Sequence, residues 1–148
     1  MNETLAATLR KNSIPCVLEP KNWPLRTKPS NAGHDGPDFL LFFENESVWV
    51  DLTIVTQTKK AEDKMARAVT LKQTQYEKAT QIGIDVLPLV LSSFCSFHIS
   101  CIPLFKKIQS QAGKKGVREV KNSIGVKIAK MLVFFKKQND LKCFSAVA

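Results

Sequence analysis

Two apolar runs separated by a short polar segment predict a β-hairpin in the first half of the chain. The runs cover Phe39–Phe43 and Val48–Val55, and the residues between them are Glu44-Asn45-Glu46-Ser47. Aromatic and β-branched residues favour strands, and a polar tetrapeptide between two such runs favours a turn. Nearly every position of both runs is apolar, which is typical of strands that are buried on both faces. We therefore expect helices on both sides of the sheet to which this hairpin belongs.

Other segments show helical spacing of apolar residues or short strand-like runs. Helical patterns cover Asn2–Lys11, Ala61–Ile82, Ile99–Gln111 and Asn122–Lys137. Strand patterns cover Ile14–Glu19, which Pro15 interrupts, and Val86–Leu91, in which Pro88 indicates a strand start or a sheet edge. Gly83 is a good residue to end the second helix, and Gly113 and Gly116 are expected to break the chain.

The order of these elements predicts a single α/β or α+β domain with a small mixed sheet flanked by helices. A chain of 148 residues corresponds to one domain by default. The segment Pro20–Gly36 is rich in Pro, Gly, Asn and Ser, so we expect a loop there. A loop of this length is unusual in a compact domain and is often functional, so it is expected to lie over a binding face.

Several sequence features indicate a protein of a reducing, intracellular compartment without a membrane span. No apolar run reaches 18 residues, and the start of the chain lacks the basic and apolar segments of a signal peptide. The four cysteines do not form a C-x-x-C pair, which argues against structural zinc. Buried, inert thiols are the expected state of these residues, namely Cys16, Cys95, Cys101 and Cys143.

The positive charge of the chain is concentrated near its end. The sequence has 22 Lys and Arg against 13 Asp and Glu. Eleven of the bases but only two of the acids follow residue 105, so residues 1–105 hold eleven of each and are neutral. A concentrated basic surface is typical of nucleic-acid-binding proteins, although a solvated lysine-rich helix is an alternative. The candidate nucleic-acid-binding residues are Lys106, Lys107, Lys114, Lys115, Arg118, Lys121, Lys127 and Lys130.

Two acids flank the predicted hairpin, since Asp38 opens the first strand and Asp51 closes the second. Antiparallel pairing brings both carboxylates to the same end of the sheet, where they are costly beside an apolar core unless a cation accompanies them. Oxygen ligands of this kind suit Mg²⁺ or Mn²⁺, and the carbonyl of Leu52 is a candidate third ligand. His34, in the preceding loop, is either an extra ligand or, as we favour, an ordinary loop histidine.

A basic group for such a site is available on the helix that follows. Lys72 and Tyr76 are four residues apart, so they lie on one helical face. If this face packs on the hairpin, the ammonium group of Lys72 points at the acids and Tyr76 supports it or contacts a phosphate. The alternative is a solvated lysine and a core aromatic residue.

Pro37-Asp38, the later Asp51-Leu52-Thr53 and the pair Lys72-x-x-x-Tyr76 together resemble the PD-(D/E)xK nuclease superfamily. Within it, the pattern is similar to the restriction-like endonuclease domain of LINE-type non-LTR retrotransposons, in which the lysine of the triplet is replaced by one on the next helix. The resemblance implies a restriction-endonuclease-like core over residues 1–110, followed by basic helices over residues 111–148.

The same resemblance implies catalytic roles and partners. Asp38 and Asp51 would bind Mg²⁺ or Mn²⁺, Lys72 would be the catalytic lysine, and Tyr76 would be its motif partner. The expected function is metal-dependent nicking of target DNA in the nucleus by part of a larger retrotransposon polyprotein, with a homodimer left open. The alternatives are a nuclease of the cap-snatching type that cuts RNA, a catalytically decayed nucleic-acid-binding module, and an interaction domain whose basic surface meets acidic proteins or a membrane.

Overall fold

The computed structural model describes residues 2–27, 35–56 and 58–147, and its fold is α/β with a mixed four-stranded sheet flanked by helices. No helix in these residues is long and apolar enough to cross a bilayer. The elements in chain order are α1 (Asn2–Lys11), β1 (Cys16–Leu18), β2 (Phe39–Phe42), β3 (Ser47–Val55), α2 (Ala61–Gln75), α3 (Glu77–Gln81), β4 (Val86–Ser92), the 3₁₀ turn η1 (Ile99–Cys101) and α4 (Ile102–Val147).

The sheet has the strand order β1-β2-β3-β4. The first three strands pair antiparallel, as expected for the hairpin, whereas β3 and β4 run parallel. Parallel neighbours need a crossover connection, and α2 and α3 form it. Pro88 lies on β4, which is an edge strand, so the expectation of an edge position for this proline is confirmed.

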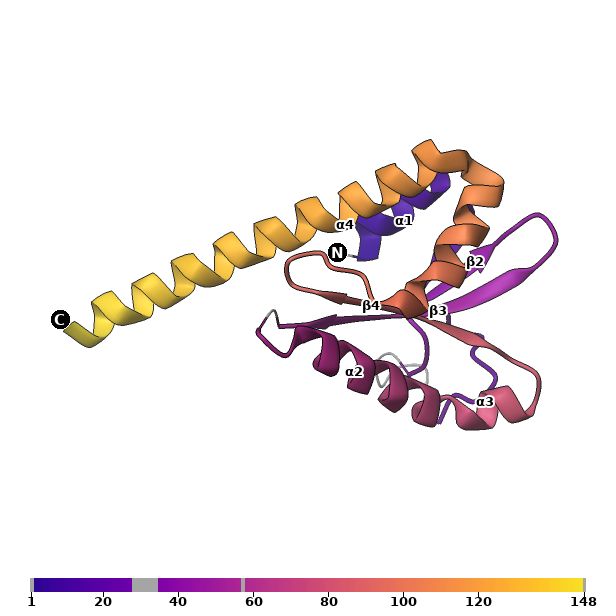
Figure 1. Cartoon of the computed structure of the whole chain (residues 1–148), viewed down its shortest axis with the longest axis horizontal. Coiled ribbons are helices and arrows are strands. Elements are labelled where there is room, and N and C mark those ends of the chain that lie inside the picture. The colour runs from indigo at the N-terminus through magenta and orange to yellow at the C-terminus, as the bar shows by residue number, and fades with distance from the viewer. Residues whose placement is uncertain (1, 28–34, 57, 148) are drawn as a thin grey trace.

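Helices cover both faces of the sheet, as the apolar strands predicted (Figure 1). Side chains alternate along a strand, so the two faces of β3 differ in their partners. Val48 and Val50 pack in the main core with α1 and α4, whereas Trp49 packs with Tyr76 on the other side. Asp51 has the same parity as Trp49 and therefore faces α2 and α3.

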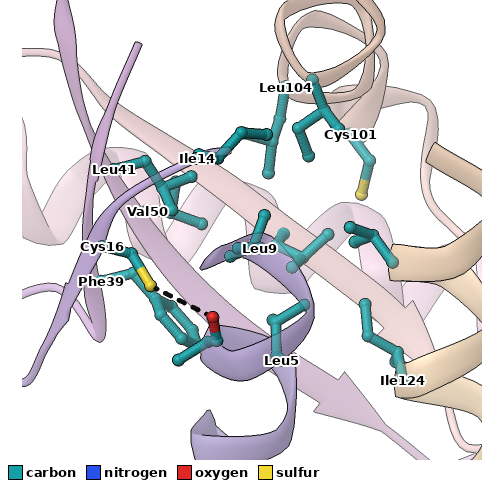
Figure 2. Packing of buried hydrophobic residues seen from close by; sticks show 14 of the residues in the cluster. Leu5, Leu9, Ile14, Cys16, Phe39, Leu41, Val50, Cys101, Leu104 and Ile124 are labelled. Atoms are coloured by element: carbon teal, nitrogen blue, oxygen red, sulfur yellow. Dashed lines mark hydrogen bonds between the residues drawn. The ribbon is translucent and has the colours of Figure 1, made fainter. Parts of the chain in front are cut away.

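The main core lies between the sheet and the helices α1 and α4 (Figure 2). Leu5 and Leu9 of α1 contact Phe39 of β2, and α4 contributes Leu104 and Ile124. Each of these five side chains is at most 3% exposed. Burying a large apolar side chain of this kind contributes about 1.5–3 kcal/mol, so this layer carries much of the stability of the fold.

Two of the four thiols are buried, as expected. Cys16 donates to the carbonyl of Ala6 at 3.7 Å, and Cys101 donates to that of Val90 at 3.3 Å. Burial raises the pKa of both thiols, which keeps them protonated and unreactive. Cys95 is half-buried, and the side chain of Cys143 lies outside the described residues.

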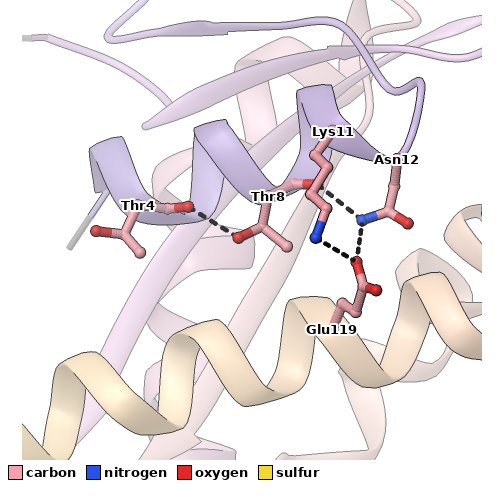
Figure 3. A network of polar contacts seen from close by, with 5 residues as sticks. All are labelled: Thr4, Thr8, Lys11, Asn12 and Glu119. Atoms are coloured by element: carbon pink, nitrogen blue, oxygen red, sulfur yellow. Dashed lines mark hydrogen bonds and ion pairs between the residues drawn. The ribbon is translucent and has the colours of Figure 1, made fainter.

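A polar network joins the end of α1 to α4 (Figure 3). The amide of Asn12 donates to the carbonyl of Thr8 and to Glu119 Oε2, at 2.9 Å each, and Lys11 Nζ lies 3.9 Å from the same carboxylate. The hydrogen bond from Asn12, followed by the nearby bases, lowers the pKa of Glu119. The crossing of the two helices is close, since a Cβ on Gly116 would lie 3.3 Å from Asn12 Oδ1.

The first helix prediction to need correction concerns the segment before Gly83, whereas the predicted break at Gly113 is confirmed. The predicted helix Ala61–Ile82 is divided at Tyr76, where the backbone leaves helical geometry (φ −101°, ψ 15°), although Gly83 does follow its end with φ +84°. Gly113 breaks α4 with φ 71° and ψ −179°, a conformation that essentially only glycine adopts.

Gly116, by contrast, lies inside the helix, so its predicted break is wrong. The final helix also begins before Asn122 and extends past Lys137 to Val147. Lys, Arg, Glu and Val between Gly113 and Asn122 tolerate helical geometry, and α4 packs there on α1, so tertiary contact extends the helix.

Candidate active site

The hairpin brings Asp38 and Asp51 together, as its sequence predicted. Phe39 pairs with Val50, so the two acids occupy the next pair of positions. The backbone N–H of Leu52 donates to Asp38 Oδ2 at 2.8 Å, which fixes the first carboxylate beside β3. One detail is corrected: Asp51 does not close its strand, because β3 continues to Val55 in parallel pairing with β4.

Lys72 reaches Asp51 from the last turn of α2. Its Nζ atom lies 2.6 Å from Asp51 Oδ2, in an approach that is an ion pair and not an aligned hydrogen bond. Asp51 is only 4% exposed, whereas the side chain of Lys72 retains 26% of its exposure. A buried carboxylate needs a counter-charge, and Lys72 supplies it here. The structure therefore places Lys72 at the acids and not on the solvated surface.

Tyr76 follows Lys72 by one helical turn and is 6% exposed. Burial, followed by the negative charge of Asp51 beside it, raises the pKa of the Tyr76 hydroxyl well above its ordinary value. The hydroxyl lies near enough to Asp51 for the charge of that carboxylate to raise its pKa, but it has no well-aligned hydrogen-bond partner in the described part of the chain. Tyr76 is therefore a neutral, protonated group with hydrogen-bonding capacity to spare.

Trp23 holds Tyr76 in place, and the sequence did not point to it. Its ring packs edge-on against Tyr76 at 5.8 Å and against Trp49 of β3 at 4.9 Å between centroids. Trp23 belongs to the predicted loop Pro20–Gly36, and it is 5% exposed. A tryptophan within a proline-rich loop was the available signal, because so large an apolar residue needs a place to be buried. The described part of this loop thus packs on the candidate site; His34 lies outside the described residues.

Gly36 closes the same loop against Trp23. Its φ of +123° lies in the region that favours glycine, and a Cβ there would stand 2.7 Å from Trp23 Cδ1. The glycine therefore allows the loop to pass the indole and enter Pro37-Asp38. Through Trp23, this end of the loop packs against Tyr76 at the end of α2 and against Trp49 of β3, close to Asp51.

A cleft of about 430 Å³ opens beside Asp51 along α2 and α3. Its walls carry the carboxylates of Asp51, Glu77 and Asp85 and a single ammonium group, that of Lys72, as far as the described residues go. Three negative charges against one positive charge give the cleft a formal charge of −2. A phosphodiester would meet net repulsion here unless a cation were bound.

The oxygen atoms around Asp38 and Asp51 suit a hard divalent cation, and of the residues that carry them Asp51 and Tyr76 also line the cleft. In antiparallel pairs one residue directs its N–H and C=O toward the same neighbour, so the carbonyl of Leu52 lies on the Asp38 side of β3. The hydroxyls of Thr53 and Tyr76 add to this carbonyl and the two carboxylates, since both are buried and have no hydrogen-bond partner among the residues that the structure describes. No set of three or more His, Cys, Asp or Glu is clustered in the described residues, so water would complete the coordination. Mg²⁺ commonly keeps several waters and one or two carboxylates, which this donor set can provide.

The predicted nucleic-acid-binding residues do not line this cleft. All of them belong to α4, which lies on the opposite face of the sheet from α2 and α3 (Figure 1). Lys107 forms an ion pair with Glu46 at the hairpin tip, and the Lys121 ammonium lies 4.7 Å from the ring centroid of Phe105. Most of the others, including Lys114, Lys115 and Arg118, are exposed.

Comparison with known proteins adds no family to this description. No family model matches the chain, and the search of curated proteins finds no match.

Proposed function

We propose that this chain is a Mg²⁺- or Mn²⁺-dependent endonuclease domain with a restriction-endonuclease-like core, and that it hydrolyses phosphodiester bonds in DNA. The observation that carries the proposal is the buried Asp51 carboxylate, which shares one end of the hairpin with Asp38 and meets the Lys72 ammonium at 2.6 Å. Two neighbouring acids, one of which meets a base in the wall of a cleft, are the groups that metal-assisted hydrolysis of a phosphodiester needs.

Each residue has a distinct role in the proposed reaction. Asp38, Asp51 and the Leu52 carbonyl would hold the cation, which when bound lowers the pKa of water and neutralises charge on the phosphate. Lys72 lies where its ammonium can stabilise the negative charge that develops on the phosphate oxygens. Tyr76, kept protonated, donates its hydroxyl hydrogen to Asp51 or to a phosphate oxygen and limits the positions open to Lys72.

The source and setting of the domain belong to the same proposal. The Lys72-x-x-x-Tyr76 pattern with Pro37-Asp38 and Asp51 supports derivation from a retrotransposon polyprotein that nicks DNA in the nucleus. The cleft, with a charge of −2 before a cation binds, supports metal dependence independently of that resemblance.

Nicking of supercoiled plasmid tests the proposal. The wild-type chain should nick the plasmid with Mn²⁺ and not with chelator, and Asp51→Asn should reduce the rate by at least about 100-fold, since it removes a charge needed in the transition state. The matched control is Asp63→Asn, which alters an exposed acid of α2 outside the cleft. Equal nicking by the wild type and Asp51→Asn, with both folded by circular dichroism, would show that the cleft is not the active site.

A second candidate function is a decayed nuclease that only binds nucleic acid. The observation that favours it is the charge of α4, which is independent of the cleft. This candidate predicts retention of DNA without metal-dependent cleavage. Parallel assays with single-stranded RNA would identify a nuclease of the cap-snatching type, which would cut RNA in preference to plasmid.

A further inference from the structure

We infer that the outer face of α4 is a binding surface for the phosphate backbone of duplex nucleic acid, separate from the cleft. We call this surface the α4 basic face and define it by the exposed residues Lys114, Lys115, Arg118, Lys130, Lys136 and Lys137. The inference adds to the proposed nuclease function an anchoring site for the substrate on the opposite side of the molecule.

The packing of α4 determines which way this face points. A stripe at spacings of four consists of Val120, Ile124 and Ile128. These side chains are at most 4% exposed and belong to the main core, together with residues of α1 and the sheet. At 100° per residue, Lys115 and Arg118 lie more than 90° away from Ile124, the middle of this stripe, and both are exposed to solvent. The sheet and the main core separate these two bases from the cleft. The stretch of duplex that contacts the α4 basic face therefore cannot also contact Asp51.

Glu119 compensates only part of the charge on this face, although Lys115 and Arg118 lie near enough to help lower the pKa of its carboxyl. Only two acids follow residue 105, and one of them, Glu119, is already bound to Asn12 and Lys11. Lys114 and Arg118 are four residues apart, and Lys115 and Arg118 are three apart. Like charges at these spacings each destabilise a helix by about 0.2–0.5 kcal/mol. A bound polyanion removes this repulsion, which an ordinary helix surface avoids by mixing charges of both signs.

The length of the face identifies the kind of polyanion. The C-terminal half of α4 extends beyond the body of the protein, so the row of bases continues past the core (Figure 1). From Lys115 to Lys137 the helix rises about 33 Å at 1.5 Å per residue. The exposed bases of the face form two groups along this length, one over residues 114–118 and one over residues 130–137, and the length that they span matches about one turn of duplex.

Binding to a labelled 30-base-pair duplex, measured by fluorescence anisotropy in chelator over a series of salt concentrations, tests the inference. The triple charge reversal K115E/R118E/K130E should weaken binding at least tenfold and reduce the slope of log K against log salt by about two to three. The matched control K64E/R67E/K78E reverses three exposed bases of α2 and α3 on the cleft side, and it should weaken binding less than threefold.

Two results would overturn the inference. One is equal weakening by both triple variants, or none by the α4 variant, when circular dichroism shows that all are folded. The other is binding to vesicles of 30% anionic lipid without binding to the duplex, which would assign the face to membranes. Because chelator suppresses cleavage and the readout is binding alone, failure of the nuclease proposal leaves this test intact.

Discussion

The carboxylate of Asp51 has two competing partners in the proposed function. In the structure Lys72 pairs with its Oδ2 atom, and a divalent cation held by Asp51 would compete for the same carboxylate. A lysine in this position neutralises the buried acid before a cation binds and must give up part of that contact afterwards. The same ammonium then becomes available to a phosphate oxygen, so metal binding and placement of the lysine are linked.

Lys72→Met should therefore bind Mn²⁺ more tightly while losing cleavage. Removing the competing ammonium should strengthen binding by about three- to tenfold, or ~0.7–1.4 kcal/mol, and the loss of charge stabilisation should slow nicking at least about 100-fold. Isothermal titration calorimetry measures the first effect and the plasmid assay the second. Arg67→Met, an exposed change on the same helix, is the control; weaker Mn²⁺ binding by Lys72→Met would contradict the competition.

Tyr76 gives the protein a specific sensitivity to alkali. Because its pKa is raised in the folded chain, the hydroxyl stays protonated there, whereas the unfolded chain loses this proton near pH 10. The contribution of Tyr76 is thus complete below about pH 10 and declines above it by ~1.4 kcal/mol per pH unit. Tyr76→Phe should lose this part of the decline, as urea unfolding at pH 9, 10 and 11 would reveal. Parallel pH profiles of the two proteins would refute the assignment.

The sequence predicted which charged and aromatic residues come together at the candidate site, but not which residues pack around them. Asp38 and Asp51 were predictable because hairpin pairing and the side-chain period of two place them together, and Lys72 and Tyr76 because a helical repeat places them on one face. Trp23 and Gly36 were not, since their contact joins a loop to a helix and a strand through packing that no local period encodes.

At the scale of elements, the described ends of the loop Pro20–Gly36 pack against the candidate site. Trp23 fills the space between Trp49 and Tyr76, and Gly36 lets the chain turn back over the indole into Asp38. The position of Asp38 therefore depends on a residue fifteen positions earlier. Weakening the contact between Gly36 and Trp23 should lower both the stability of the fold and the proposed activity.

Gly36→Ala compared with Gly83→Ala tests this role. Both glycines have positive φ, but a Cβ at Gly83 meets nothing within 4 Å, whereas at Gly36 it would stand 2.7 Å from Trp23. Gly83→Ala should cost about 1 kcal/mol from backbone strain alone, and Gly36→Ala about 1–3 kcal/mol more because the indole must move. Denaturant unfolding gives the difference, and equal costs would show that Trp23 yields freely.

The helices show where local signals suffice and where they do not. The glycine at 113 breaks α4 as expected, because its φ and ψ are open essentially to glycine alone. The glycine at 116 does not break the helix; it lies inside it, where a Cβ would stand 2.3 Å from Ala112 Cβ and 3.3 Å from Asn12 Oδ1. The interruption at Tyr76 also has no sequence signal, since it arises where the aromatic side chain is buried against Trp23.

At the scale of the whole molecule, the C-terminal helix belongs to the core for part of its length. Ile124 and Ile128 pack in the same cluster as Leu5 and Phe39, more than ten residues past the boundary expected at residue 110. The spacing of apolar residues over Asn122–Lys137 predicted a helix but could not specify its partner. Among the described residues, Ile128 is the last one of α4 that belongs to the main core, and the α4 basic face continues beyond it.

Ile124→Ala should consequently destabilise the entire fold and not a separate extension. Removing this 1% exposed side chain should cost about 2–5 kcal/mol in one cooperative transition, whereas Val126→Ala, at a position 55% exposed, should change stability by less than about 0.5 kcal/mol. Thermal unfolding followed at two wavelengths would detect the outcome. Two separated transitions would instead support an independent unit after residue 110.

The position of Pro88 has a consequence for the solubility of the chain. An edge strand as apolar as β4 offers unpaired backbone groups to any second strand, which is a common route to aggregation. Pro88 removes one donor from the first half of that edge, and the returning segment covers the second half, since Leu91 bridges to Phe97 and His98 donates to the carbonyl of Val90 at 2.9 Å. At the other edge, β1 offers only three residues. In the described residues, one edge of the sheet is thus partly covered and the other is short, which limits the backbone that either edge offers to a second strand.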